Sequence, residues 1–102
     1  MGTVEDSLKE DYIYFLEELL RVEREWEALP KGSISAKKIH SKIYYYHQFR
    51  EGKKVISKSL GPVFPGGLAQ EIQRRKRIEA QKKEIKKNLK TISRALGKGL
   101  TG

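Results

Sequence analysis

Seven apolar side chains recur along residues 3–29 at alternating steps of four and three, and this regularity constrains the fold more than any other feature. They are Leu8, Tyr12, Phe15, Leu19, Val22, Trp26 and Leu29, called here the first seam. Because such steps return to one side of an α-helix, the pattern predicts an amphipathic helix packed against another helix. Thr3 is placed to cap this helix, and Pro30 with Gly32 ends it.

A second seam predicts a partner helix over residues 67–96. Its apolar members are Ile78, Ile85, Leu89, Ile92 and Leu96, with Arg75 and Lys82 at the intervening seam positions. Gly97 is expected to end this helix and to leave residues 97–102 as a flexible tail. Two long seams in one short chain predict an antiparallel helical hairpin.

The segment between the two helices changes from a helical to a strand-like period. We expect three antiparallel strands over residues 33–39, 43–50 and 54–60, turning at His40-Ser41 and at Glu51-Gly52. The predicted fold class is therefore α+β in the order α-β-β-β-α. The expectation is a single domain over residues 1–102, with an acidic helix at 3–29, a β-meander at 33–61 and a basic helix at 67–96.

Pairing Arg50 with Lys53 divides the side chains of the second and third strands between two faces. One face, expected to be the core side, carries Ile43, Tyr45, Phe49, Ile56 and Leu60. The other carries Tyr44, Tyr46, Gln48, Arg50, Lys53, Val55, Ser57 and Ser59.

The charges are divided unequally along the chain, which has a formal net charge of +9. Residues 1–30 carry nine acidic and three basic side chains, whereas residues 31–102 carry 19 basic and four acidic ones. Such an asymmetry indicates either pairing between the two parts or an anionic partner for the second.

The basic helix is the main candidate for contacts with a nucleic acid or a nucleoprotein complex. Its candidate residues are Arg74, Arg75, Lys76, Arg77, Lys83, Lys87, Lys90 and Arg94. Residues 74–98 hold eleven bases and two acids, and most of these bases share the side of the helix opposite its seam. A row of cations suits a phosphate backbone, although a solvated lysine-rich face is the alternative.

Two further surfaces are candidates for binding. Tyr44 and Tyr46 beside Arg50 and Lys53 could stack bases and hold phosphates, or could only stabilise cross-strand pairs. A second apolar stripe on the acidic helix lies about 100° from the first seam. Its residues, Ile13, Leu16 and Leu20, either cover the sheet or form a protein-interaction surface, for example in a homodimer.

Several functional classes find no support in these residues. The chain has no Cys, no catalytic motif and only two histidines, so no cofactor, metal site or enzymatic activity is expected. His47 is expected to pack on the core side of its strand or to make a pairing hydrogen bond, and His40 to be a solvated turn residue. The longest apolar runs are too short for a membrane span, and a cytoplasmic location is expected.

The middle of the chain resembles a hairpin motif of small uncharacterised bacterial and mobile-element proteins. The matching residues are Leu29 to Ile34, Tyr44 to Tyr46, Arg50 to Val55 and Ser57 to Gly61. The resemblance implies a bacterial, plasmid or phage setting and assigns no binding residue. In size, charge polarity and lack of enzymatic motifs, the chain is also similar to anti-CRISPR proteins.

The sequence therefore predicts a small, basic, non-enzymatic accessory protein that binds nucleic acid or a nucleoprotein complex. An inhibitor that blocks a CRISPR effector nuclease is the alternative, in which the acidic face of residues 5–27 could also mimic nucleic acid. A third hypothesis is a structural helical-hairpin subunit without affinity for nucleic acid.

Overall fold

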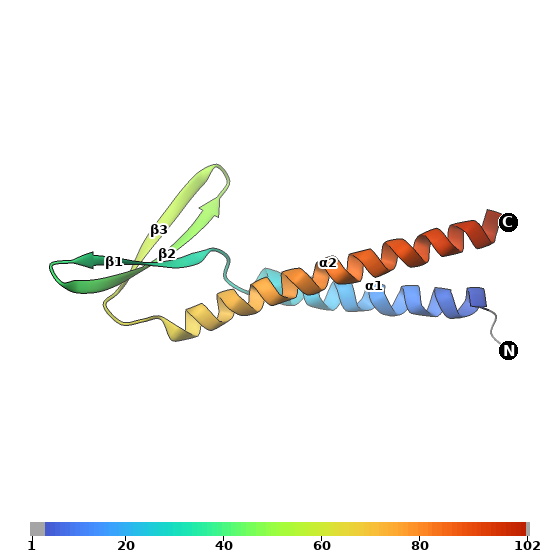
Figure 1. The fold of residues 1–102 in the computed structure, drawn as a ribbon, viewed down its shortest axis with the longest axis horizontal. Helices are drawn as coiled ribbons and strands as arrows, with labels where there is room; N and C mark the ends of the chain where they lie inside the picture. Colours follow the sequence, from blue (N-terminus) through green and yellow to red (C-terminus); the bar gives the residue numbers. More distant parts are fainter. Residues whose placement is uncertain (1–3, 102) are drawn as a thin grey trace. The chain divides into compact units, whose positions relative to one another are not determined.

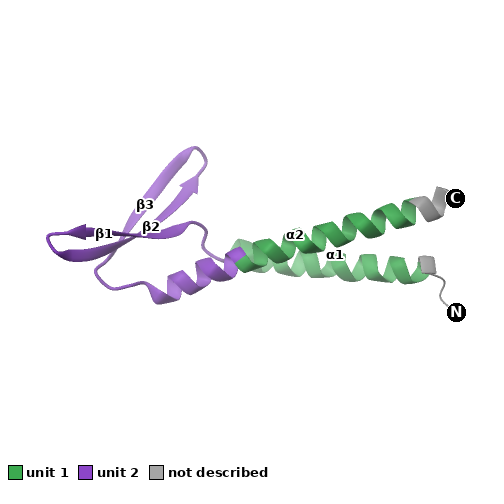
Figure 2. Ribbon diagram, in the orientation of Figure 1, with its two compact units in different colours: residues 1–28, 77–102 green, residues 29–76 purple. Residues whose placement is uncertain are grey.

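A computed structural model describes the backbone of residues 4–101 and the side chains of residues 6–97. It contains helix α1 (Val4–Ala28), strands β1 (Ser33–Ile39), β2 (Lys42–Glu51) and β3 (Lys54–Gly61), and helix α2 (Gly66–Thr101) (Figure 1). The predicted α-β-β-β-α order and the α+β class are confirmed. The chain divides into two compact units, residues 1–28 with 77–102 (unit 1) and residues 29–76 (unit 2) (Figure 2).

Unit 1 is the predicted antiparallel pair of helices, formed by α1 and the later part of α2 (Figure 2). Val22, Ile78 and Ile92 are buried, and every other apolar seam residue in this unit is at least partly buried. Lys82, a cation within the second seam, places its Nζ 3.7 Å from the ring centroid of Trp26. This cation–π contact explains how a charged residue is accommodated at a seam position.

The predicted end of the second helix at Gly97 is wrong, because α2 continues to Thr101. Gly97 does not have the positive φ of a helix-ending glycine. Glycine inside a helix costs only about 1 kcal/mol relative to alanine, so one glycine does not force an end. The expected flexible tail is thus helical over residues 97–101, whereas Gly102 and the predicted cap Thr3 lie outside the described residues.

Unit 2 is built on a three-stranded antiparallel sheet in the order β1-β2-β3. Ile39 pairs with Lys42, which confirms His40-Ser41 as the first turn. His40 and Ser41 have φ values of 49° and 69°, the backbone of a two-residue type I′ turn. Residues with a Cβ rarely adopt such angles, so this turn carries local strain.

The second turn lies one residue later than predicted, and each pairing partner in β3 shifts by two residues. Glu51 pairs with Lys54 and Arg50 with Val55, so the connecting residues are Gly52 and Lys53. Gly52 has a φ of 61° and can take the first position of a type II′ turn, which requires this conformation. Because side chains alternate with a period of two, a two-residue shift leaves the predicted faces of the strand residues unchanged. Lys53, predicted on a strand face, lies in the turn instead.

A bulge and a close backbone approach shape the sheet. The register shifts where Tyr45 pairs with Gly61 and Tyr46 with Ser59, which leaves Leu60 as the extra residue. At Gly32, which has a φ of 101°, an added Cβ would lie 2.1 Å from the Gln48 carbonyl oxygen. Both its backbone angle and the lack of a side chain are therefore required where the chain enters β1.

Side chains of unit 2 also tie its loops to the sheet and to α2. The Arg75 guanidinium donates to the Leu29 carbonyl at 3.0 Å, and the Phe64 and Tyr45 rings meet edge to face. The core side predicted for the sheet is confirmed only in part, because Ile43 is 50% exposed whereas Tyr45, Phe49, Ile56 and Leu60 are half-buried.

Candidate nucleic-acid interface

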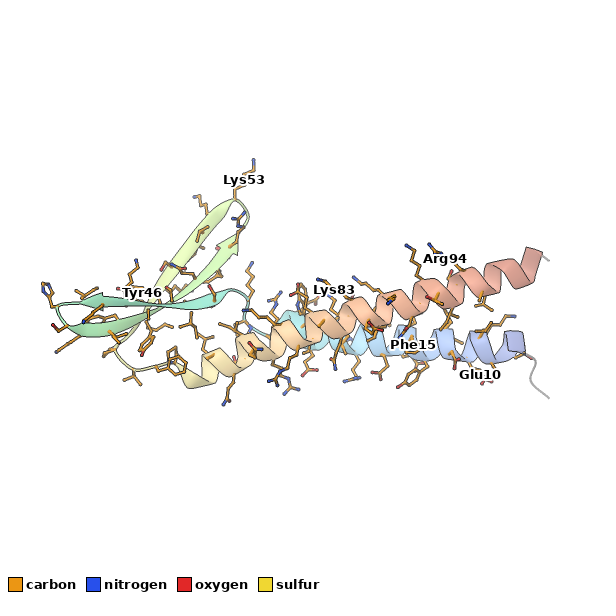
Figure 3. The ribbon with its side chains drawn as sticks, in the orientation of Figure 1. Glu10, Phe15, Tyr46, Lys53, Lys83 and Arg94 are labelled. Atoms are coloured by element: carbon orange, nitrogen blue, oxygen red, sulfur yellow. The ribbon has the colours of Figure 1, made fainter. Side chains whose placement is uncertain are left out.

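Four cations follow one side of α2 within unit 1. They are Lys83, Lys87, Lys90 and Arg94, called here the basic face. All four are exposed, and their spacing places them on the side of the helix opposite Ile78 and Ile92, which are buried. Figure 3 shows Lys83 and Arg94 projecting from α2 away from α1. At 1.5 Å per residue, the face is about 16 Å long.

The basic face makes no ion pair with α1 in the part of the chain whose side chains are described. Among the described side chains, none of these four cations takes part in an ion pair. The ion pair seen on α1 joins Arg21 to Glu18, two residues of the same helix, at 2.6 Å. Of the two interpretations of the charge asymmetry, internal pairing therefore finds no support at these four residues.

The run Arg74 to Arg77 does not form a single cluster. Successive residues of a helix point about 100° apart, so these four side chains leave α2 in four directions. The Arg75 guanidinium is part-buried and bonded to the Leu29 carbonyl, where it holds unit 2 together. Arg74, Lys76 and Arg77 are exposed. The structure thus separates Arg75, a structural residue, from the other basic candidates.

The sheet carries the tyrosine candidates on the predicted face. Tyr44 and Tyr46 are half-buried, and the Lys37 Nζ lies 5.1 Å from the Tyr46 ring centroid. Lys37 is not among the residues predicted from the sequence to bind. The predicted turn at His40-Ser41 already pairs Lys37 with Tyr44 and so places Lys37 on this face, and this pairing could have identified it. Opposite Tyr46, the Ser35 hydroxyl is buried and has no hydrogen-bond partner among the described residues. A base that stacked on the ring face beneath the Lys37 ammonium would have to displace this cation.

Arg50 and Lys53 do not share one position with these tyrosines. Arg50 is exposed near the end of β2, and Lys53 lies at the tip of the turn between β2 and β3, as Figure 3 shows. The tip of a hairpin presents a cation to solvent rather than beside the rings. The predicted tyrosine-and-cation cluster is therefore replaced by Tyr46 with Lys37, which is a cation–π pair within the sheet.

The two histidines lie at different places in unit 2. His40 is exposed in the first turn, as predicted. His47 is half-buried beside Phe49, and its Nε2–H donates to the Lys31 carbonyl at 2.7 Å. This bond fastens the segment before β1 to the sheet, the structural role expected of His47. No group of three His, Asp or Glu side chains in the described part of the chain is placed to hold a metal.

A pocket of about 180 Å³ lies between the helices of unit 1, lined by Glu18, Arg21, Val22, Gln81, Glu84 and Ile85. Pockets for small-molecule ligands measure about 300–1,000 Å³, so this one is undersized for such a ligand.

No helix in the described part of the chain has the length and hydropathy of a membrane span.

The apolar stripe of α1 remains on the surface. Ile13, Leu16 and Leu20 are 56%, 40% and 52% exposed. Acidic residues lie around it, among them the exposed Glu10 and Glu17. Large apolar side chains grouped on one side of a helix indicate an interaction surface when no part of the chain buries them.

The family described as "Domain of unknown function (DUF6788)" matches residues 12–74, more than half of the chain. The chain therefore belongs to this family. No curated protein and no solved structure matches it. The matched segment contains the sheet and the stripe at residues 13–20, whereas the basic face lies beyond it.

Proposed function

We propose that this protein is a non-enzymatic, cytoplasmic binding protein whose basic face contacts the phosphate backbone of a nucleic acid, alone or within a nucleoprotein complex. The observation that carries the proposal is the row of four exposed cations without an ion pair in the described residues. Along about 16 Å of a duplex axis each strand presents about five phosphates, a density that four cations can match.

The experiment is fluorescence-anisotropy binding to labelled single-stranded DNA, duplex DNA and structured RNA at 50 and 200 mM salt. Four neutralised phosphates correspond to a slope of about −3.6 in log K against log salt on duplex DNA. The affinity should then fall by about 150-fold between the two salt concentrations. Absence of binding at 50 mM salt to all three probes would contradict the proposal.

Charge-reversal variants test which residues are used. Lys83→Glu/Lys87→Glu/Lys90→Glu should abolish binding, because it removes three of the four cations of the basic face. Lys38→Glu/Lys42→Glu/Lys54→Glu changes the net charge equally at three exposed residues of the sheet and should retain binding to duplex DNA. Equal loss in both triple variants would show an effect of net charge and would remove the basic face as the site.

The sheet extends this proposal as a separate surface. Tyr46→Ala should leave the salt slope unchanged, because aromatic stacking releases no counterions, and should weaken binding to single strands only. The alternative function, inhibition of a CRISPR effector through the acidic face, stays a prediction. It would require binding to a protein partner that survives 200 mM salt.

A further inference from the structure

We propose that the exposed apolar stripe of α1 is a self-association surface, on which α1 of a second copy of this chain packs in antiparallel orientation. The proposal goes beyond nucleic-acid binding and concerns a different helix. It starts from Ile13, Leu16 and Leu20, each of which remains at least 40% exposed in unit 1.

The stripe is the centre of a longer pattern on α1, called here the outer seam. Its members are Lys9, Ile13, Leu16, Leu20, Glu23 and Glu27. They follow one another at steps of four, three, four, three and four, the spacing that keeps one side of a helix against a partner helix. At 1.5 Å per residue, the outer seam is about 27 Å long. It is apolar in the middle and charged at both ends.

The steps between successive residues of the outer seam are the same whether they are counted from Lys9 or from Glu27. An antiparallel copy can therefore place each seam residue opposite another seam residue, without a gap in the register. Leu16 then faces Leu20 of the second copy, and Leu20 faces Leu16. Ile13 faces Glu23 of the second copy, so the apolar contact is made by the four leucines of the two copies, whose exposed surface is removed from water.

The charges at the ends favour this orientation over the parallel one. In the antiparallel register Lys9 faces Glu27 of the second copy, and the same contact occurs twice. A lysine ammonium has three donors, so a contact that Lys9 makes within its own chain leaves it able to reach that carboxylate. A parallel copy would instead oppose Lys9 to Lys9 and Glu27 to Glu27, which is repulsive.

A flanking pair adds to the same preference. Glu10 and Arg24 lie along one side of the outer seam and, in the described structure, form no ion pair. The antiparallel register brings Glu10 beside Arg24 of the second copy, again twice. Figure 3 shows Glu10 on the side of α1 that is turned away from α2. The opposing contact is Glu17 with Glu17 at the centre, which weakens the expected dimer.

The test is sedimentation-velocity ultracentrifugation of the full chain over a hundredfold concentration range, without nucleic acid. We expect a reversible monomer–dimer equilibrium. Leu16→Asp/Leu20→Asp should weaken dimerisation by about a hundredfold or more, since it places charges in the apolar centre. Tyr14→Asp introduces one such charge on the same helix at a 58% exposed residue outside the outer seam, and should leave the dimer intact. Far-UV circular dichroism of all variants verifies that they fold.

Orientation is tested by exchanging the end charges. Lys9→Glu alone should weaken the dimer, and Lys9→Glu/Glu27→Lys should restore it. Only in an antiparallel dimer does residue 9 of one copy face residue 27 of the other, so that the exchanged charges still attract each other. A monomer at every concentration, or a dimer that survives Leu16→Asp/Leu20→Asp, would overturn the proposal. A dimer that the double exchange does not restore would overturn the antiparallel register. If Lys83→Glu/Lys87→Glu/Lys90→Glu leaves dimerisation unchanged, self-association does not depend on the basic face and is independent of the proposed nucleic-acid binding.

Discussion

The helical hairpin of unit 1 and the sheet of unit 2 are stabilised in different ways. In the hairpin, Val22, Ile78 and Ile92 are buried in a continuous seam. In the sheet, no described strand residue is buried, and the register depends on two tight turns, a bulge and a glycine that admits a neighbouring strand. The packing of the helices therefore depends on apolar burial, whereas the register of the sheet depends on backbone geometry at a few positions.

The largest effect is expected from shortening a seam residue. Ile78→Ala should lower the free energy of unfolding by about 3 kcal/mol, because it leaves a cavity in the seam. Ile43→Ala in β2 is the matched change in the sheet and should cost less than about 1 kcal/mol, since Ile43 is 50% exposed. Urea unfolding followed by the fluorescence of Trp26, the one Trp of the chain, and by circular dichroism measures both. Equal losses would contradict the comparison.

A backbone change should have the next largest effect, and in the sheet. Gly32→Ala should cost about 2–3 kcal/mol, because the new Cβ meets the Gln48 carbonyl and the positive φ is strained. Gly52→Ala is the control, since Gly52 also has a positive φ but nothing lies within 4 Å of an added Cβ. The difference between the two variants in urea unfolding measures the close approach alone. A smaller loss at Gly32 than at Gly52 would show that the approach is not constraining.

Relief of strain in the first turn should stabilise the sheet. His40→Asn/Ser41→Gly supplies the residues that a type I′ turn favours and should raise the free energy of unfolding by about 1 kcal/mol. Thermal unfolding followed by circular dichroism measures the change. His40→Ala/Ser41→Ala is the matched control and should not stabilise, because alanine tolerates a positive φ poorly. Stabilisation by both variants would contradict the role of the backbone angles.

The smallest effect concerns the surface of the hairpin. The Arg21 guanidinium donates to Glu18 at 2.6 Å and holds the pKa of that carboxyl below its usual value. Because the pKa of Glu18 is lowered in the folded state, the pair contributes at neutral pH and its contribution is lost as the pH falls through the lowered pKa. In an NMR titration, Arg21→Gln should return the pKa of Glu18 toward its ordinary value and leave stability at pH 7 unchanged within error. An unchanged pKa of Glu18 would contradict this cause.

The spacing of apolar residues determined the helices well. The first seam predicted α1 to within one residue at each end, and the second seam identified Ile78 and Ile92, which are buried. The faces of the sheet could also be predicted, because they depend only on the alternation of side chains. The register could not, since it depends on which two residues form the second turn, and both Glu51-Gly52 and Gly52-Lys53 contain the required glycine.

The candidate sites divide in the same way. The basic face could be predicted because a helix has a fixed 100° step, which groups Lys83, Lys87, Lys90 and Arg94 without tertiary information. The bond of Arg75 to the Leu29 carbonyl could not be predicted, because it joins residues far apart in the chain. The contact of Lys37 with Tyr46 also required the pairing of β1 with β2.

The sequence by itself thus determined the helical hairpin, the number of strands and the position of the charges, because these follow from local periodicity. Only the tertiary structure decided which charges are already used. It bonds Arg75 to a backbone carbonyl, packs Lys82 against Trp26, and leaves the basic face and the apolar stripe of α1 exposed. The physical reason is that charge and apolarity belong to single residues, whereas their availability depends on the neighbours that folding brings to them.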